Sequence, residues 1–161
     1  MAQINANRVG TGTSGNTTPF AKARETGSAV VDSPTGNDTF AVRYFRSSGR
    51  GGTTHNFNRT YIYFDTSQIT GSIETAFIDI RGVTNTSADI IVISSSAFGG
   101  DGGTALSVGD FYNSLDYSTP YSSEVTTWIT GTPENSIELN QTARDYIASS
   151  ANFGVAVIEY D

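Results

Sequence analysis

The chain has 161 residues, a formal net charge of −7 and no cysteine. This length suits one domain with a real core, and the lack of cysteine excludes disulfides, thiolate metal sites and a cysteine nucleophile. The acidic balance without a basic stripe argues against nucleic acid and anionic membranes as partners, and no segment approaches the roughly 20 apolar residues of a membrane span.

The first segment, residues 1–27, has no hydrophobic periodicity, and we expect an extended N-terminal arm there. Ile4, Val9 and Phe20 are its main apolar side chains, and we expect them to anchor the arm on a partner. A frayed terminus is the alternative. The start of the chain lacks the apolar segment of a secretory signal, so we expect a product made in the cytoplasm and not exported through a cleaved signal.

The rest of the chain, residues 28–161, alternates short apolar segments with clusters of Gly, Pro, Asn, Asp and Ser. Such segments indicate short strands separated by turns. We expect strands over 29–31, 40–45, 61–65, 75–82, 89–94, 125–130, 136–139 and 153–161. A glycine-rich loop is expected over 46–56, and an irregular, turn-rich region over 96–124.

One clear helix is predicted near the C-terminus, over residues 140–150. Asn140 suits its N-cap, and Ala143, Tyr146 and Ile147 share one face. A second, weaker helix start is expected at Ser107.

Together the pattern predicts an all-β fold, a jelly-roll-like antiparallel β-sandwich with one short helix near the C-terminus. We expect Phe64, Ile78 and Trp128 in its core. The domain should span residues 28–161, after the arm of residues 1–27.

Few residues in the sequence suggest catalysis. His55 is the only histidine, no G-x-S-x-G nucleophile elbow occurs, and the six glutamates stand in no motif that indicates a shared cleft. The glycine clusters at 49–52 and 99–103 lack the lysine and the following helix of a phosphate-binding loop. Asp101 could meet Ca²⁺, but a solvated loop is favoured. We therefore expect no enzyme, with no catalytic, cofactor-binding or metal-binding residues.

Three tyrosines in the turn-rich region, Tyr112, Tyr117 and Tyr121, are predicted to lie on loops. Aromatic side chains on loops often form binding surfaces. We expect these three to contact a partner or a glycan.

Two segments resemble the DNRLRE-type, carbohydrate-binding-module-like β-sandwich family. The first is "RTYIYFDTSQITGSIETAFIDIRG" and the second is "SIELNQTARDYIASSANFGVAVIEYD", in the order that the family has. The resemblance covers roughly residues 40–161, with a gap in the middle. The residues that carry the first motif are Arg59, Phe64, Asp65, Ile69, Ile73, Ala76, Phe77 and Ile78.

The segment "DFYNSLDYSTPYSSEVTTWITGTPENSIELNQTA" further resembles small virion-associated proteins of tailed phages, especially those of cyanobacterial and marine hosts. This resemblance implies a non-enzymatic structural protein of a virion, assembled in the host cytoplasm. A capsid decoration (cement) protein that bridges major capsid protein subunits is favoured, with neighbouring copies as further partners and a trimer as a suitable symmetry. A tail or fibre component and a glycan-binding module that contacts the host surface are the alternatives.

Overall fold

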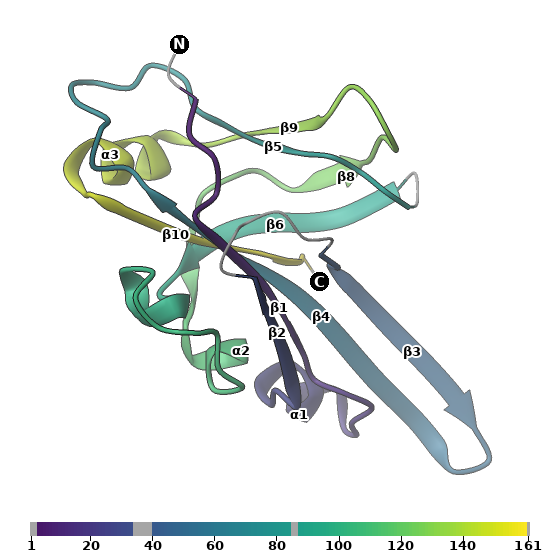
Figure 1. The fold of residues 1–161 in the computed structure, drawn as a ribbon. Helices are drawn as coiled ribbons and strands as arrows, with labels where there is room; N and C mark the ends of the chain where they lie inside the picture. Colours follow the sequence, from purple (N-terminus) through teal and green to yellow (C-terminus); the bar gives the residue numbers. More distant parts are fainter. Residues whose placement is uncertain (1–2, 34–39, 85–86, 161) are drawn as a thin grey trace.

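The computed structural model describes residues 3–33, 40–84 and 87–160, and this part of the chain is an antiparallel all-β fold with short helices (Figure 1). The strands are β1 (Arg8–Thr13), β2 (Ala29–Ser33), β3 (Arg43–Gly49), β4 (Gly52–Asp65), β5 (Phe77–Ile80), β6 (Ser87–Ser95), β7 (Leu115–Pro120), β8 (Val125–Thr127), β9 (Asn135–Glu138) and β10 (Asn152–Glu159). The helices are α1 (Phe20–Glu25), α2 (Asp110–Asn113), α3 (Gln141–Ser149) and the 3₁₀ turn Ala97–Gly100.

A large antiparallel sheet forms the body, in the order β2-β1-β4-β10-β6-β7. The long strand β4 is its centre: its second half pairs with β1 and β10, and its first half pairs with β3. β8 also joins this sheet, through β6, whereas β5 and β9 pair with each other as a small second sheet.

Both faces of the large sheet are covered by other parts of the chain, and successive side chains of each strand point to opposite faces. On one face, Ile62 of β4 and Val155 of β10 pack in a cluster with Ile78 of β5, Ile137 of β9 and residues of α3. On the other face, Tyr61 and the neighbouring side chains pack against the 3₁₀ turn and the loop after it. The two-layer arrangement confirms the all-β, sandwich-type prediction.

The predicted C-terminal helix is confirmed as α3. The side chain of Asn140 caps it by accepting a hydrogen bond from the Ala143 backbone N–H at 3.1 Å. Ala143 and Ile147 are buried, and Tyr146 is partly exposed. The weaker helix start is also present, since Asp110 of α2 accepts hydrogen bonds from the backbone and hydroxyl of Ser107.

The three expected core residues differ in burial. Ile78 is buried, as predicted. Phe64 and Trp128 are only half-buried, although both pack against the core cluster of the sandwich. Phe64 is the second-last residue of β4 and lines an open groove.

The expected extended arm over residues 1–27 is wrong for most of its length. β1 lies inside the sheet between β2 and β4, and Val9 is 3% exposed. The sequence of β1 does not show the apolar alternation of a strand, because two of the buried positions of β1 are glycines. A Cβ atom on Gly10 would lie 2.7 Å from Leu106 Cδ2, and one on Gly12 would lie 3.1 Å from the Phe111 ring. Backbone in close contact with large side chains therefore replaces the expected apolar alternation.

The expected glycine-rich loop over 46–56 is instead a β-hairpin. β3 and the start of β4 pair from Arg43↔Asn58 to Gly49↔Gly52, around a two-residue turn at Arg50 and Gly51. The hairpin projects away from the body (Figure 1), and every residue of β3 is exposed. The turn-rich region likewise contains a strand that was not predicted, β7.

Candidate docking surface

An aromatic cluster joins α1 to the base of the projecting hairpin. The Phe20 ring meets the rings of Tyr44, His55 and Phe57 edge to face, at centroid distances of 5.7, 5.2 and 5.4 Å. Tyr44 stacks on Phe57 at 4.8 Å, and its hydroxyl lies 2.7 Å from Nδ1 of His55. Phe57 is buried, whereas Phe20 and Tyr44 remain exposed. The single histidine thus takes part in an aromatic contact surface.

A second pair of exposed aromatic residues extends this surface. The rings of Tyr112 (α2) and Tyr117 (β7) lie 6.0 Å apart. The Arg24 guanidinium lies over Phe20 at 5.8 Å and over Tyr117 at 5.9 Å, so it connects the two groups. We call the set Phe20, Arg24, Tyr44, Tyr112 and Tyr117 the aromatic band.

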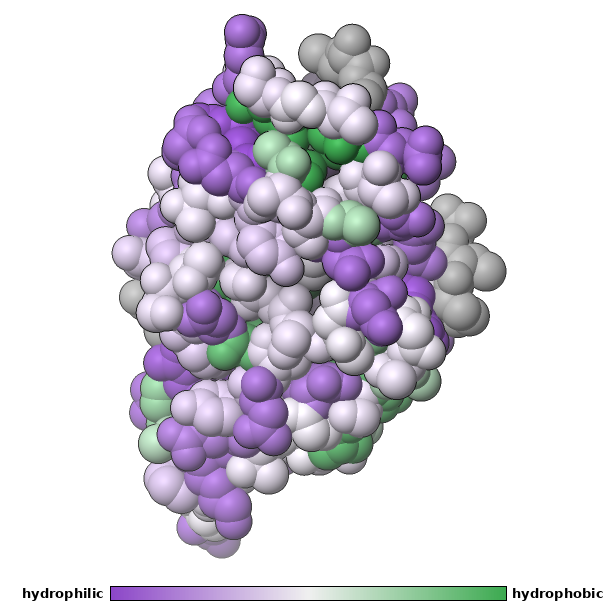
Figure 2. Space-filling view, turned by 90° about the vertical axis from the view of Figure 1, so that its left-hand side faces the viewer, coloured by the Kyte–Doolittle hydropathy of each residue, from purple (hydrophilic) through white to green (hydrophobic). Residues whose placement is uncertain are grey.

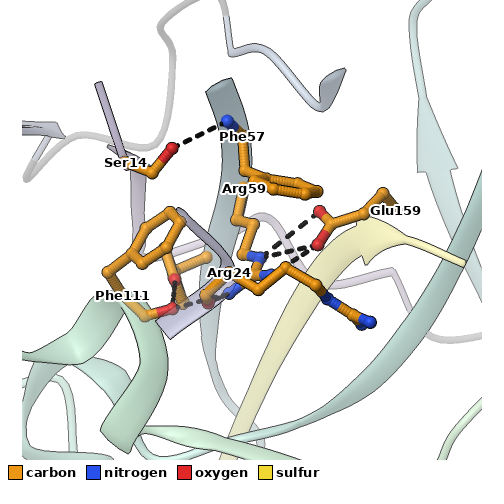
Figure 3. A network of polar contacts seen from close by, with 7 residues as sticks. Ser14, Arg24, Phe57, Arg59, Phe111 and Glu159 are labelled. Atoms are coloured by element: carbon orange, nitrogen blue, oxygen red, sulfur yellow. Dashed lines mark hydrogen bonds and ion pairs between the residues drawn. The ribbon is translucent and has the colours of Figure 1, made fainter. Parts of the chain in front are cut away.

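The aromatic band is fixed from behind by a buried arginine, Arg59 of β4 (Figure 3). Its Nε donates to both carboxylate oxygens of Glu159 at 3.1 and 3.3 Å, and Nη2 also donates to this carboxylate. Its Nη1 donates to the carbonyl oxygens of Arg24 at 2.9 Å and of Phe111 at 3.1 Å. One side chain therefore holds the end of β10, the end of α1 and the helix α2 together.

The electrostatics of Arg59 agree with a structural role. Burial disfavours its charged form, but the hydrogen bond and the opposite charge of Glu159 outweigh this, so that its pKa lies above the ordinary value. The guanidinium also stacks over the Phe111 ring at 4.5 Å. Burial raises the pKa of the neighbouring Tyr61, whose hydroxyl donates to the Phe111 carbonyl oxygen at 2.9 Å.

An open groove of about 1930 Å³ separates the two layers beside the hairpin. Half-buried apolar residues line it, among them Phe40, Val42 and Trp128, together with Ile4 from the N-terminal segment. On the face drawn in Figure 2, residues of intermediate hydropathy predominate, hydrophilic ones are scattered among them, and strongly apolar ones form only small patches.

The structure separates the six residues that the sequence suggested for partner binding. Phe20, Tyr112 and Tyr117 come together in the aromatic band, and Ile4 lines the groove. Val9 also lines the groove, although it is almost fully buried, whereas Tyr121 belongs to neither surface because it is buried. Tyr121 lies under α3 and stacks on Phe153 at 5.4 Å. Its prediction as a loop contact is corrected accordingly.

The sequence did not predict Arg24 and Tyr44 in this surface, nor the buried Arg59–Glu159 pair behind it. The pair did leave a signal. Glu159 ends an otherwise apolar strand, and a buried carboxylate requires a partner. Arg24 and Tyr44 left none, because only the tertiary fold brings them together.

Other candidate positions carry local structure. The side chain of Asp101 accepts a hydrogen bond from the Gly103 backbone at 2.8 Å, within its own glycine-rich loop. Among the described residues, no group of three or more His, Cys, Asp or Glu side chains could hold a metal ion. In the same part of the chain, no helix is long and apolar enough to cross a membrane.

Comparison with known proteins adds no relative. No protein-family model, no curated protein and no solved structure matches this chain.

Proposed function

We propose that this protein is a non-enzymatic structural component of a tailed-phage virion, a decoration protein that docks on major capsid protein subunits and stabilises the shell. The phage setting rests on the sequence resemblance described above. The observation that favours docking is the β3–β4 hairpin, which projects from the body with all of β3 exposed.

The physical argument concerns the stability of the hairpin. A two-stranded hairpin by itself is marginally stable in water. This one presents Tyr44 and Phe45 to solvent, which a free surface element has no need to do. These rings point to opposite faces of β3, and their burial in a partner that encloses the hairpin would stabilise the hairpin and the complex together. The docking element proposed here is therefore the hairpin with the aromatic band, in place of the N-terminal arm.

The test compares two exposed aromatic residues on purified particles. Phe45 on the hairpin and Tyr160 beyond β10 are both 49% exposed. We expect Phe45→Ser to lower the occupancy of the protein on heads, and Tyr160→Ser to leave it unchanged. Equal occupancy for both variants would refute docking through the hairpin.

The number of copies per particle distinguishes a protein of the head from a protein of the tail. A decoration protein occurs in many copies over the head, and particles without it should withstand less heat. A few copies at the tail tip would refute the decoration role and support a tail or fibre component.

A glycan-binding module is the second candidate, favoured by the exposed Tyr112–Tyr117 pair beside Arg24. Sugar rings stack on such aromatic faces. Glycan-array binding that is lost in Tyr117→Ser and kept in Phe45→Ser would support this candidate over the first.

A further inference from the structure

We propose that the free edge of β3 in one copy pairs with the free edge of β9 in a second copy, so that copies join head to tail. This inference rests on the proposed structural role and names one of its contacts, the contact between neighbouring copies. Two observations carry it, the unpaired strand edges and their opposite charges.

The first observation is that both strands have one unpaired edge. Within the described residues, β3 pairs with β4 alone and β9 with β5 alone. The edge of β4 that does not face β3 is already paired at the base of the hairpin. There the backbone of Ser14 and Thr17 forms hydrogen bonds with the backbone of Phe57 and His55. The open edge of the hairpin is therefore that of β3. Unpaired strand edges are templates for pairing with another chain.

The second observation is the charge of each edge. The hairpin carries Arg43, Arg46 and Arg50, and no acidic residue occurs between positions 40 and 64. This local excess of positive charge stands out in a chain of net charge −7. Like charges on β3 would oppose the pairing of two hairpins with each other, so a partner edge of opposite sign is favoured.

The β9 edge has the opposite sign. A shallow groove of about 470 Å³ runs beside it, and Glu124 and Glu138 line this groove. Glu134 immediately precedes β9. The one basic residue in the lining, Arg144, donates to the Leu139 carbonyl and to Gln141, and is thus engaged locally. An added basic strand would meet carboxylates on both sides of this groove.

Two other strand edges, those of β2 and β7, fit less well. β2 exposes Val31, and its Asp32 is paired with Arg8 of the same copy. β7 ends at Pro120, which lacks a backbone donor.

The geometry also requires two copies. The hairpin and β9 lie at opposite ends of the molecule (Figure 1), so they cannot meet within one chain. A contact between two different surfaces of the same protein is heterologous. It closes into a ring, such as a trimer, or continues as an open chain.

The experiment is a charge-exchange cycle followed by sedimentation velocity over a range of protein concentrations. The hairpin variant is Arg46→Glu with Arg50→Glu, and the sheet variant is Glu134→Lys with Glu138→Lys. We expect the parent chain to self-associate, each double variant to lose at least about tenfold in association, and the chain with all four changes to regain it. High salt should weaken the parent's association, because exposed charge pairs are screened.

A control is Lys22→Glu, an exposed position on α1 that lies on neither strand edge and that shifts the net charge in the same direction as the hairpin variant. It should leave association unchanged. A parent chain that stays monomeric at every concentration, or a four-change chain that does not recover, would overturn the inference. If such a monomeric chain still coats particles through Phe45, this inference fails and the proposed function stands. If copies associate but never bind particles, the reverse holds.

Discussion

The buried pair Arg59–Glu159 allows the sharpest test of the fold around the aromatic band. The Arg59 side chain is fully buried, and that of Glu159 is nearly so. Glu159→Ala removes the carboxylate that accepts from Nε and Nη2, and leaves a buried guanidinium whose charge is balanced by no anion. Removing one partner of a buried pair costs about 3–5 kcal/mol. That is a large fraction of the roughly 5–15 kcal/mol that stabilises a typical domain.

A double variant distinguishes the energy of the ion pair from the energy of the hydrogen bonds around it. In Arg59→Met with Glu159→Leu both charges are gone. The Phe111 carbonyl keeps the Tyr61 hydroxyl as a donor, but the Arg24 carbonyl loses its partner. A fully buried orphaned group costs about 1–3 kcal/mol, and this partly buried carbonyl costs less than the upper value. We therefore expect the double variant to be more stable than Glu159→Ala, although less stable than the parent chain.

The assay is urea unfolding, followed by far-ultraviolet circular dichroism, with the midpoints compared at constant slope. With a slope of about 2 kcal/mol per molar urea, Glu159→Ala should lower the midpoint by about 2 M. A loss below about 1 kcal/mol in Glu159→Ala would mean that the pair is solvated. If the double variant loses the sum of what Arg59→Met and Glu159→Leu lose when each is made alone, the two residues do not interact.

Two further predictions follow from the same region. Burial raises the pKa of Tyr61 above its ordinary value of 10.0, so the unfolded chain loses this proton at lower pH than the folded chain. The contribution of Tyr61 to the free energy of unfolding is complete below pH 10. Above pH 10 it falls by up to about 1.4 kcal/mol per pH unit. Tyr61→Phe should therefore reduce the loss of stability with rising pH, measured by urea unfolding between pH 9 and 11. Deletion of residues 1–27 should abolish cooperative unfolding, because it removes β1 from the middle of the sheet; a truncated chain with an unchanged thermal midpoint would show that the N-terminal segment is a separate arm.

The elements that the sequence predicted correctly are those with strong local signals. β6 follows from the apolar run over residues 89–94, and α3 follows from the Asn140 cap with its apolar face. In both cases the residues that determine the structure are neighbours along the chain. The class of fold follows from many such short segments.

The elements that it missed depend on contacts between distant segments. β1 reads as a polar arm, because Gly10 and Gly12 give no apolar signal until Leu106 and Phe111 pack over them. The sequence of the hairpin predicts a loop, because neither face of β3 is buried. The aromatic band combines α1, β3, α2 and β7, which only the topology brings together. Glycine in a strand and a charged residue in an apolar strand are the two local signs that could have indicated these contacts.

The buried arginine gives the projecting hairpin a fixed base. β4 runs from the hairpin turn into the centre of the sheet, and Arg59 lies on it just inside the body. Through this one side chain α1, α2 and β10 are tied to β4 at the point where the hairpin leaves the sheet. A strand edge that is held in one orientation loses less conformational entropy on docking than a flexible loop does. The hydrogen bonds and the charge of Glu159 offset the cost of burying the guanidinium, and the buried pair thereby fixes the base of the hairpin to the body of the protein.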